Sequence, residues 1–136
     1  MPIKNDYQRV ARRSLTASSA VLTANIQEKS AFLSYHALES TGTALSIHHN
    51  LPYGMGVGHN RKITLFMNVA RRHRSNAQVL RACVEMVNLR NLYLYPIENH
   101  PTHTVILPEN ALSIPEARSL LRRVEYVVNW VDPKII

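Results

Sequence analysis

Arg90 and Asn91 are the residues with the clearest chemical potential, because they end a strongly apolar stretch that Pro96 closes. Arg90 falls four residues after Met86 and three after Val87, at the edge of a stripe of apolar residues with helical spacing. Burying a guanidinium without a partner is costly, so Arg90 is expected to have a carboxylate partner or to line a cleft. The alternative is that its side chain extends from the edge of the stripe into solvent. Periodicity alone does not decide between them.

The basic residues are clustered, and most of them are arginine. The 136-residue chain has a formal net charge of +7, and Arg supplies 12 of its 16 basic residues. The resulting positive electrostatic potential favours the binding of polyanions, and Arg side chains can contact phosphate groups in a bidentate manner. Basic surfaces also occur on ordinary soluble proteins. The residues that we predict to contact nucleic acid or a nucleotide are Arg61, Lys62, Arg71, Arg72, Arg74, Arg90 and Asn91.

Other chemistries have little support in the sequence. His48, His49 and His59, or His100 with His103, could form partial metal sites, but no Cys pair or His-Glu-x-x-His motif accompanies them. We therefore expect no metal site and no cofactor, and the roles of these histidines stay open. There is no Gly-x-Ser-x-Gly motif, and the nine acidic residues are scattered, so serine hydrolase and paired-carboxylate chemistry are not indicated.

The apolar periodicity predicts helices that would hold these residues. Ser113 and Glu116 form a capping box that marks the start of the last helix. Gly42 lies inside the second expected helix, where it is unfavourable, which suggests a close neighbour. Residues 105–107 are expected to form a short extended segment in an otherwise irregular stretch. The expected helices span about 6–26, 27–47, 61–73, 76–94 and 113–131.

These elements predict an all-α protein, an antiparallel bundle of four or five helices. The length suits one domain covering residues 1–136, with its core at about 6–131. No apolar run approaches the roughly 20 residues that span a bilayer. The basic N-terminus does not resemble a secretory signal, and the single Cys83 suits a reducing compartment. We therefore expect a cytoplasmic protein that does not enter membranes.

Three segments together resemble the HEPN family (higher eukaryotes and prokaryotes nucleotide-binding). Residues 28–39, Glu-Lys-Ser-Ala-Phe-Leu-Ser-Tyr-His-Ala-Leu-Glu, are similar to the second helix of these domains. Residues 58–62, Gly-His-Asn-Arg-Lys, resemble the turn that opens their third helix. Arg90 and Asn91 fall where the family has its Arg-Asn-x-x-x-His motif. The similarity extends from about residue 6 to residue 130 in the order and spacing of the helices.

This resemblance implies a HEPN-like helical bundle, often a homodimer whose Arg-bearing helices line a shared cleft. Many members are metal-independent ribonucleases, and many of these are toxins encoded beside a minimal nucleotidyltransferase antitoxin. Other members bind RNA or nucleotides without catalysis. The family places the second and fourth helices side by side, so we expect a structural ion pair between Glu39 and Arg90.

The chain departs from the family motif at the fifth residue after Arg90, which is Tyr95 and not His. A general base works best with a pKa near the operating pH, and an unperturbed Tyr is mostly protonated at neutral pH. Arg90 could still stabilise a developing phosphorane charge. We therefore expect an RNA- or nucleotide-binding protein of a prokaryotic toxin–antitoxin or defence system that is not an enzyme.

Two alternatives remain open. The first is a metal-independent endoribonuclease that uses Arg90 with Tyr95 or with a loop histidine. The second is a non-enzymatic partner of a minimal nucleotidyltransferase, in which the basic surface docks an acidic protein. The sequence identifies neither the RNA or nucleotide target nor the partner.

Overall fold

A computed structural model describes residues 3–90, 95–99, 101–102 and 104–136 of the chain. The helices in this part are α1 (Ile3–Thr23), α2 (Gln27–His48), α3 (His59–Ala70), α4 (Ala77–Leu89), α5 (Pro108–Ala111) and α6 (Ile114–Val131), followed by the 3₁₀ turn η2 (Asp132–Lys134). A small antiparallel hairpin joins β1 (Ile97–Asn99) to β2 (Thr104–Ile106). The predicted all-α fold class is confirmed.

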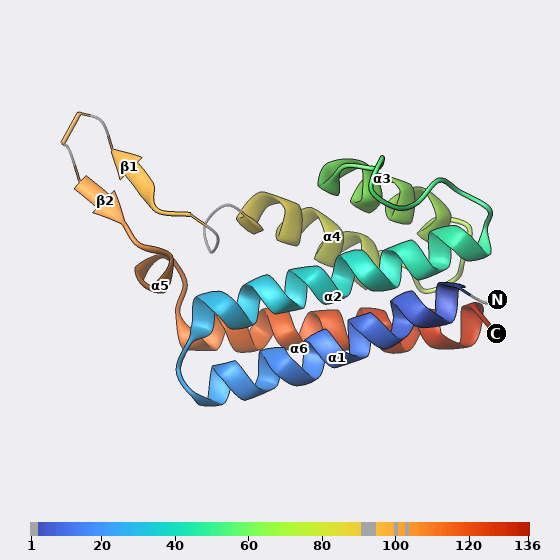
Figure 1. Ribbon diagram of the computed structural model, residues 1–136, viewed down its shortest axis with the longest axis horizontal. Coiled ribbons are helices and arrows are strands. Elements are labelled where there is room, and N and C mark those ends of the chain that lie inside the picture. Colours follow the sequence, from blue (N-terminus) through green and yellow to red (C-terminus); the bar gives the residue numbers. More distant parts are fainter. Residues whose placement is uncertain (1–2, 91–94, 100, 103) are drawn as a thin grey trace.

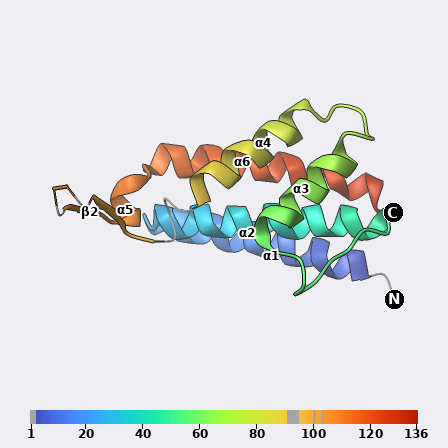
Figure 2. The same ribbon diagram turned by 90° about the horizontal axis from the view of Figure 1, so that it is seen from above.

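The long helices form one bundle with α2 at its centre. Helices α1, α2 and α6 lie side by side along the length of the molecule, and the chain ends lie together at one end (Figure 1). Helix α2 runs antiparallel to α1, whereas α6 runs in the same direction as α2. Helix α3 packs on α2, and α4 packs on α6 and α3, as the second view also shows (Figure 2). Helix α2 therefore separates α1 from α3.

Small polar residues allow α1 and α2 to approach closely. Ser18 is fully buried, and its Oγ lies 2.8 Å from both the backbone oxygen and the Oγ of Ser30 and 2.9 Å from the Oγ of Ser34. Nearer the chain ends, the Gln8 amide donates to the backbone oxygen of Val128, while its oxygen accepts from the Thr41 hydroxyl. These buried hydrogen bonds fix the register of α1, α2 and α6, because each polar group needs its partner.

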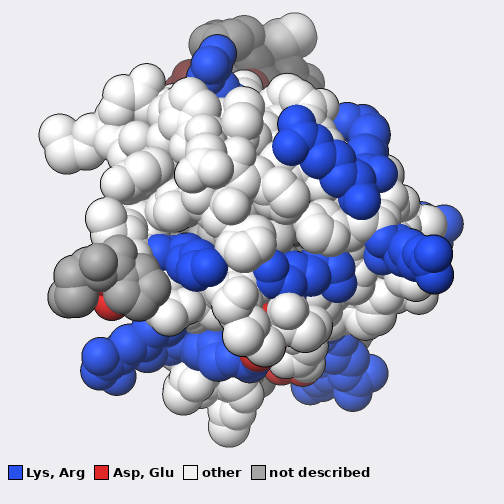
Figure 3. Space-filling view, turned by 90° about the vertical axis from the view of Figure 1, so that its right-hand side faces the viewer, with Lys and Arg blue, Asp and Glu red and all other residues white. Residues whose placement is uncertain are grey.

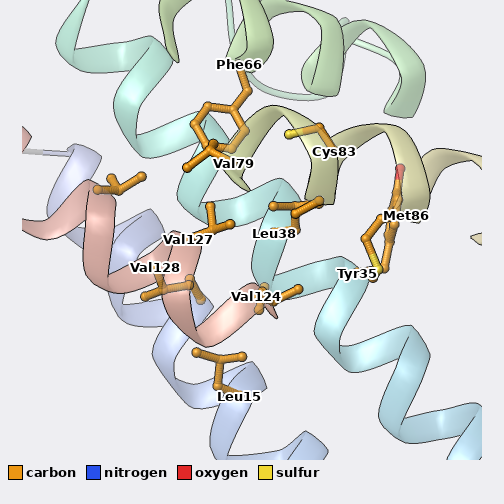
Figure 4. Packing of buried hydrophobic residues seen from close by; sticks show 14 of the residues in the cluster. Leu15, Tyr35, Leu38, Phe66, Val79, Cys83, Met86, Val124, Val127 and Val128 are labelled. Carbon is orange, nitrogen blue, oxygen red and sulfur yellow. The ribbon is translucent and has the colours of Figure 1, made fainter. Parts of the chain in front are cut away.

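The hydrophobic core lies where these helices meet. Leu38 of α2 lies near Val79 and Cys83 of α4 and Val127 of α6, with Phe66 of α3 beside them (Figure 4). Burial raises the pKa of the Cys83 thiol to about 12, which agrees with an unreactive core thiol.

Helix boundaries follow the local signals in most places. The capping box at the start of α6 is present: Ser113 Oγ accepts from the Glu116 backbone N–H at 3.2 Å. Helix α3 begins at His59, two residues before the expected start, since Gly58 has an extended conformation that suits an N-cap. Helix α4 ends at Leu89, while the expected helix extended through residues 91–94, which lie outside the described residues.

The stretch between α4 and α6 contains more structure than the sequence indicated. Residues 104–106 are extended, as expected, but they pair with residues 97–99 in a hairpin that projects from the bundle (Figure 1). Val105 and Ile106 are exposed, so no buried apolar face marks this hairpin in the sequence. Among the described residues, no helix has both the length and the hydropathy needed to cross a membrane.

The close neighbour expected at Gly42 is Phe66. A Cβ atom at Gly42 would lie 2.8 Å from two carbon atoms of the Phe66 side chain and 2.9 Å from a third. Such separations are shorter than carbon atoms tolerate, and Phe66 is itself fully buried and has no room to move. Glycine is therefore required at position 42 by the packing of α3 on α2.

We expect Gly42→Ala to lower the free energy of unfolding by about 1–3 kcal/mol, because overpacking outweighs the better helix propensity of alanine. Chemical denaturation measures the effect. Gly56→Ala is the matched control, since nothing lies within 4 Å of a Cβ at that position. Equal stability of the two variants would contradict the packing argument.

Candidate functional site

The candidate site forms where the start of α3 meets the middle of α2. Glu39 of α2 is only 7% exposed, yet both of its carboxylate oxygens are engaged. His59 Nδ1 lies 2.8 Å from Oε2, and Lys62 Nζ donates to Oε1 at 3.2 Å. His59 and Lys62 are three residues apart on the first turn of α3, so both side chains reach the same carboxylate. A buried carboxylate is thus neutralised by two cationic or polar groups.

Arg90 reaches the same region from the end of α4. Its guanidinium carbon lies 5.5 Å from the centre of the Tyr35 ring, in cation–π geometry. The ring of His59 contacts the same tyrosine, with ring centroids 6.5 Å apart and planes at 63°. Tyr35 therefore contacts both Arg90 and His59, and His59 in turn contacts Glu39.

The electrostatic environment of Tyr35 reflects this position. Tyr35 is 2% exposed, and burial raises the pKa of its hydroxyl well above the ordinary value. The negative charge of Glu39 raises this pKa further, whereas the positive charge of Arg90 lowers it. Tyr35 therefore stays protonated at neutral pH and does not act as a base. Its ring packs against Arg90 and His59.

The expected ion pair between Glu39 and Arg90 is not among the salt bridges of the described residues. Glu39 pairs with His59 and Lys62, and Arg90 lies against Tyr35. The physical reason is that α3 crosses α2 beside Glu39 and supplies two nearer partners. Tyr35, one turn earlier on α2, faces the end of α4. Both charged residues lie near Tyr35, but they have different partners.

The other residues predicted from the family motif are not part of this cluster as described. Tyr95 is 60% exposed, and no hydrogen bond or ring contact joins it to Arg90 in the described part of the chain. Asn91, His100 and His103 lie outside the described residues.

The predicted nucleic-acid-binding residues separate into two groups. Arg61 and Lys62 lie on the first turn of α3, next to His59. His59 and Arg90 both contact the ring of Tyr35, so this turn lies near Arg90. Arg71, Arg72 and Arg74 are exposed in the turn after α3, beyond its opposite end. The end of the molecule that carries the chain termini shows many Lys and Arg side chains and few acidic ones (Figure 3). The basic stretch of the sequence thus supplies two separate surfaces.

His59 is the site residue whose role the sequence left open. Its side chain is 56% exposed while its Nδ1 contacts the buried Glu39. If Nδ1 carries the proton that Glu39 accepts, Nε2 holds a lone pair, and the exposed part of the ring makes that atom accessible to a ligand. The nearest signal in the sequence was the Gly-His turn at residues 58–59, but spacing could not pair it with Glu39, 20 residues earlier.

The arrangement suits an anionic ligand. Helix α3 has no acidic residue in its first turn and no side-chain cap at Gly58. The first backbone N–H groups of a helix have no intrahelical acceptor, and the helix dipole favours an anion there. Arg61, Lys62 and Arg90 add positive charge near that helix start, so this place can bind a phosphate group.

A double-mutant cycle tests the pairing. We expect Glu39→Gln and Lys62→Ala to show a coupling energy of about 0.5–2 kcal/mol in denaturation experiments, because the two side chains are in contact. The corresponding cycle of Glu39→Gln with Arg90→Ala serves as the comparison. We expect a smaller coupling there, because Glu39 pairs with His59 and Lys62 while Arg90 lies against Tyr35. A larger coupling would show that a direct pair of Glu39 and Arg90 dominates.

The fold resembles a known structure. The chain is similar to a crystal structure described as an archaeal HEPN homologue, with a TM-score of 0.73 and 18% sequence identity over 98% of each chain. No protein-family model matches the sequence, and no curated protein matches it. At this level of identity the similarity establishes the fold alone. The protein has a HEPN-like helical fold.

Proposed function

We propose that the protein binds RNA or a nucleotide through phosphate contacts at the start of α3, with Arg61, Lys62 and Arg90 as the main contacts. The observation that carries this proposal is the convergence of His59, Lys62 and Arg90 around Tyr35 and Glu39. The uncapped start of α3 adds backbone donors to these side chains. Arg71, Arg72 and Arg74 form a second proposed contact surface beyond the other end of α3, and Asn91 stays a proposed contact outside the described residues.

The HEPN-like fold also bears on the biological setting that we propose. A cytoplasmic homodimer of a prokaryotic toxin–antitoxin or defence system is in keeping with the family that the sequence resembles. A minimal nucleotidyltransferase antitoxin is the proposed partner in such a system. Analytical ultracentrifugation, alone and with the product of a neighbouring nucleotidyltransferase gene, tests the homodimer and the partner.

RNA binding is expected to depend on salt and on Arg90. Binding of a single-stranded RNA, measured by fluorescence anisotropy, should weaken as salt rises, because bound phosphates release counterions. Arg90→Ala or Lys62→Ala should weaken binding and reduce the slope of log affinity against log salt by about 0.7 for each phosphate that the variant no longer binds.

Arg13→Ala is the charge-matched control, since Arg13 is an exposed arginine on α1, whose main packing partners are α2 and α6. If Arg13→Ala and Arg90→Ala weaken binding equally, the contact is a general charge effect and the proposed site is wrong. Failure to bind any RNA at low salt would favour the protein-partner hypothesis.

A second candidate function, metal-independent RNA cleavage, is favoured by the contact between His59 and Glu39. A carboxylate that accepts from Nδ1–H fixes the ring and leaves Nε2 as a possible general base. This arrangement could supply the base that Tyr95 cannot. The 2′-oxygen of RNA would attack the adjacent phosphorus while its proton passes to His59 Nε2. The bond to the 5′-oxygen then breaks, and that oxygen takes a proton from water, leaving a cyclic phosphate.

Cleavage of a labelled RNA in the presence of EDTA tests this candidate. We expect His59→Ala to abolish any cleavage while RNA binding persists, and Glu39→Gln to slow it, because the ring loses its orientation. His36→Ala is the control, since His36 is an exposed histidine on α2 outside this cluster. Absence of cleavage by the unmodified protein would leave binding as the function. Loss of cleavage in Tyr95→Phe, and not in His59→Ala, would assign the role to Tyr95.

A further inference from the structure

A second group of histidines lies at the end of the bundle that carries the chain termini. His48 and His49 are at the end of α2, and His73 is in the turn after α3. The ring centroids of His48 and His49 are 5.5 Å apart, and those of His49 and His73 are 5.1 Å apart. His73 in turn contacts the ring of Trp130 from α6 at 5.9 Å. The candidate RNA site uses none of these residues.

The pair formed by His49 and His73 has an unusual geometry. Their Nε2 atoms lie 2.9 Å apart, and each ring is partly exposed. Two neutral imidazoles can share this contact only if one donates Nε2–H and the other accepts. Among the described residues, the hydrogen bonds of these two side chains are with each other, so no carboxylate or carbonyl oxygen occupies either Nε2 atom.

The two Nε2 atoms are at hydrogen-bond distance, and the ring centroids 5.1 Å apart show that the rings point toward each other. Bonds of about 2.0–2.1 Å from a tetrahedral ion to two histidine nitrogens place those nitrogens about 3.3 Å apart. Both rings must therefore turn, so that their Nε2 atoms face the ion and no longer face each other. The histidine that donates Nε2–H in the pair would move that proton to Nδ1, so the exchange leaves the ring neutral.

Backbone hydrogen bonds hold both histidines in place. His49 is the C-cap residue of α2, and its backbone N–H bonds to the last turn of that helix. The backbone N–H of His73 donates to the Ala70 oxygen at 3.0 Å, and Asn76 Nδ2 donates to the His73 oxygen at 3.0 Å. Helices α2 and α3 both end here, and helix C-termini carry partial negative charge that favours a cation.

The charged groups around the pair define which ions it can take. Lys4 of α1 donates to His48 Nδ1 at 2.9 Å, and Lys134 of η2 lies over the Trp130 ring. Burial lowers the pKa of both His49 and His73, with further lowering by Arg72 and, for His73, by Lys134. The surrounding positive charge weakens the binding of hard cations most, because these bind by electrostatics alone. It weakens the binding of ions that form strong bonds to imidazole less.

We infer that His49 and His73 form a two-histidine site for a borderline divalent transition metal ion such as Ni²⁺, Cu²⁺ or Zn²⁺. Among the described residues, no group of three or more His, Cys, Asp or Glu side chains can hold a metal ion. Water therefore completes the coordination of the ion, or an external ligand does. Such a site is open to an incoming donor group, and it lies beside the exposed Arg72.

Titration of the untagged protein with NiCl₂, followed by isothermal calorimetry, tests this site. We expect about one Ni²⁺ per chain and a loss of affinity of roughly tenfold or more in His49→Ala and in His73→Ala. His36→Ala is the control on the same helix and should bind as the unmodified protein does. MgCl₂ should give no binding in the same range.

Cu²⁺ broadening of histidine signals in NMR spectra gives a second measurement that needs no variant. The signals of His49 and His73 should broaden first, before that of His59. Undiminished Ni²⁺ binding in both alanine variants, or loss of binding only when His100 and His103 are replaced, would overturn the proposal. Absence of binding by the folded, unmodified protein would overturn it as well. RNA binding is measured separately, so neither result depends on the proposed function.

Discussion

The contact between Phe66 and Gly42 is the constraint on which the rest of the structure depends. Phe66 lies so close to the α2 backbone that no side chain fits at position 42. This contact sets the distance between α2 and α3 at one point of the crossing. The contacts of His59 and Lys62 with Glu39, and of His73 with His49, hold α3 to α2 on either side of this point. The two groups of candidate site residues therefore lie on either side of the Gly42–Phe66 contact.

One stripe of α2 contributes to both candidate sites. Tyr35, Glu39, Gly42 and His49 follow one another at intervals of four, three and seven residues, so they share one face of the helix. This face meets Arg90, then His59 and Lys62, then Phe66, and finally His73. Glu39 and His49 are ten residues apart, which is about 15 Å along a helix. One face thus presents two chemically distinct places, one with a buried carboxylate and one with a pair of imidazole rings.

The sequence predicts the elements better than it predicts their partners. Helical periodicity, the capping box at Ser113 and the unfavourable Gly42 are local signals, and each corresponds to a feature of the structure. Sequence patterns do not predict the hairpin, because its exposed strands bury no apolar face. They do not predict the partners of Glu39 either. The resemblance to the HEPN family implies that Glu39 and Arg90 lie on neighbouring helices, but only the crossing of α3 over α2 decides that His59 and Lys62 are nearer.

The buried Glu39 limits what the candidate site can do with its positive charge. An almost fully buried carboxylate is stable only with partners, so Lys62 and His59 cannot both leave it to bind a phosphate. Arg90 has a different environment: its guanidinium lies over the Tyr35 ring, and its Nε is buried without a hydrogen-bond partner among the described residues. A phosphate at the proposed site would give Arg90 the acceptor that it lacks. Arg61 and the backbone N–H groups at the start of α3 would bind the phosphate beside it, and Lys62 would do so with the hydrogen-bonding capacity that Glu39 leaves. A carboxylate can therefore lie within the proposed anion-binding site, because it orients the groups around it.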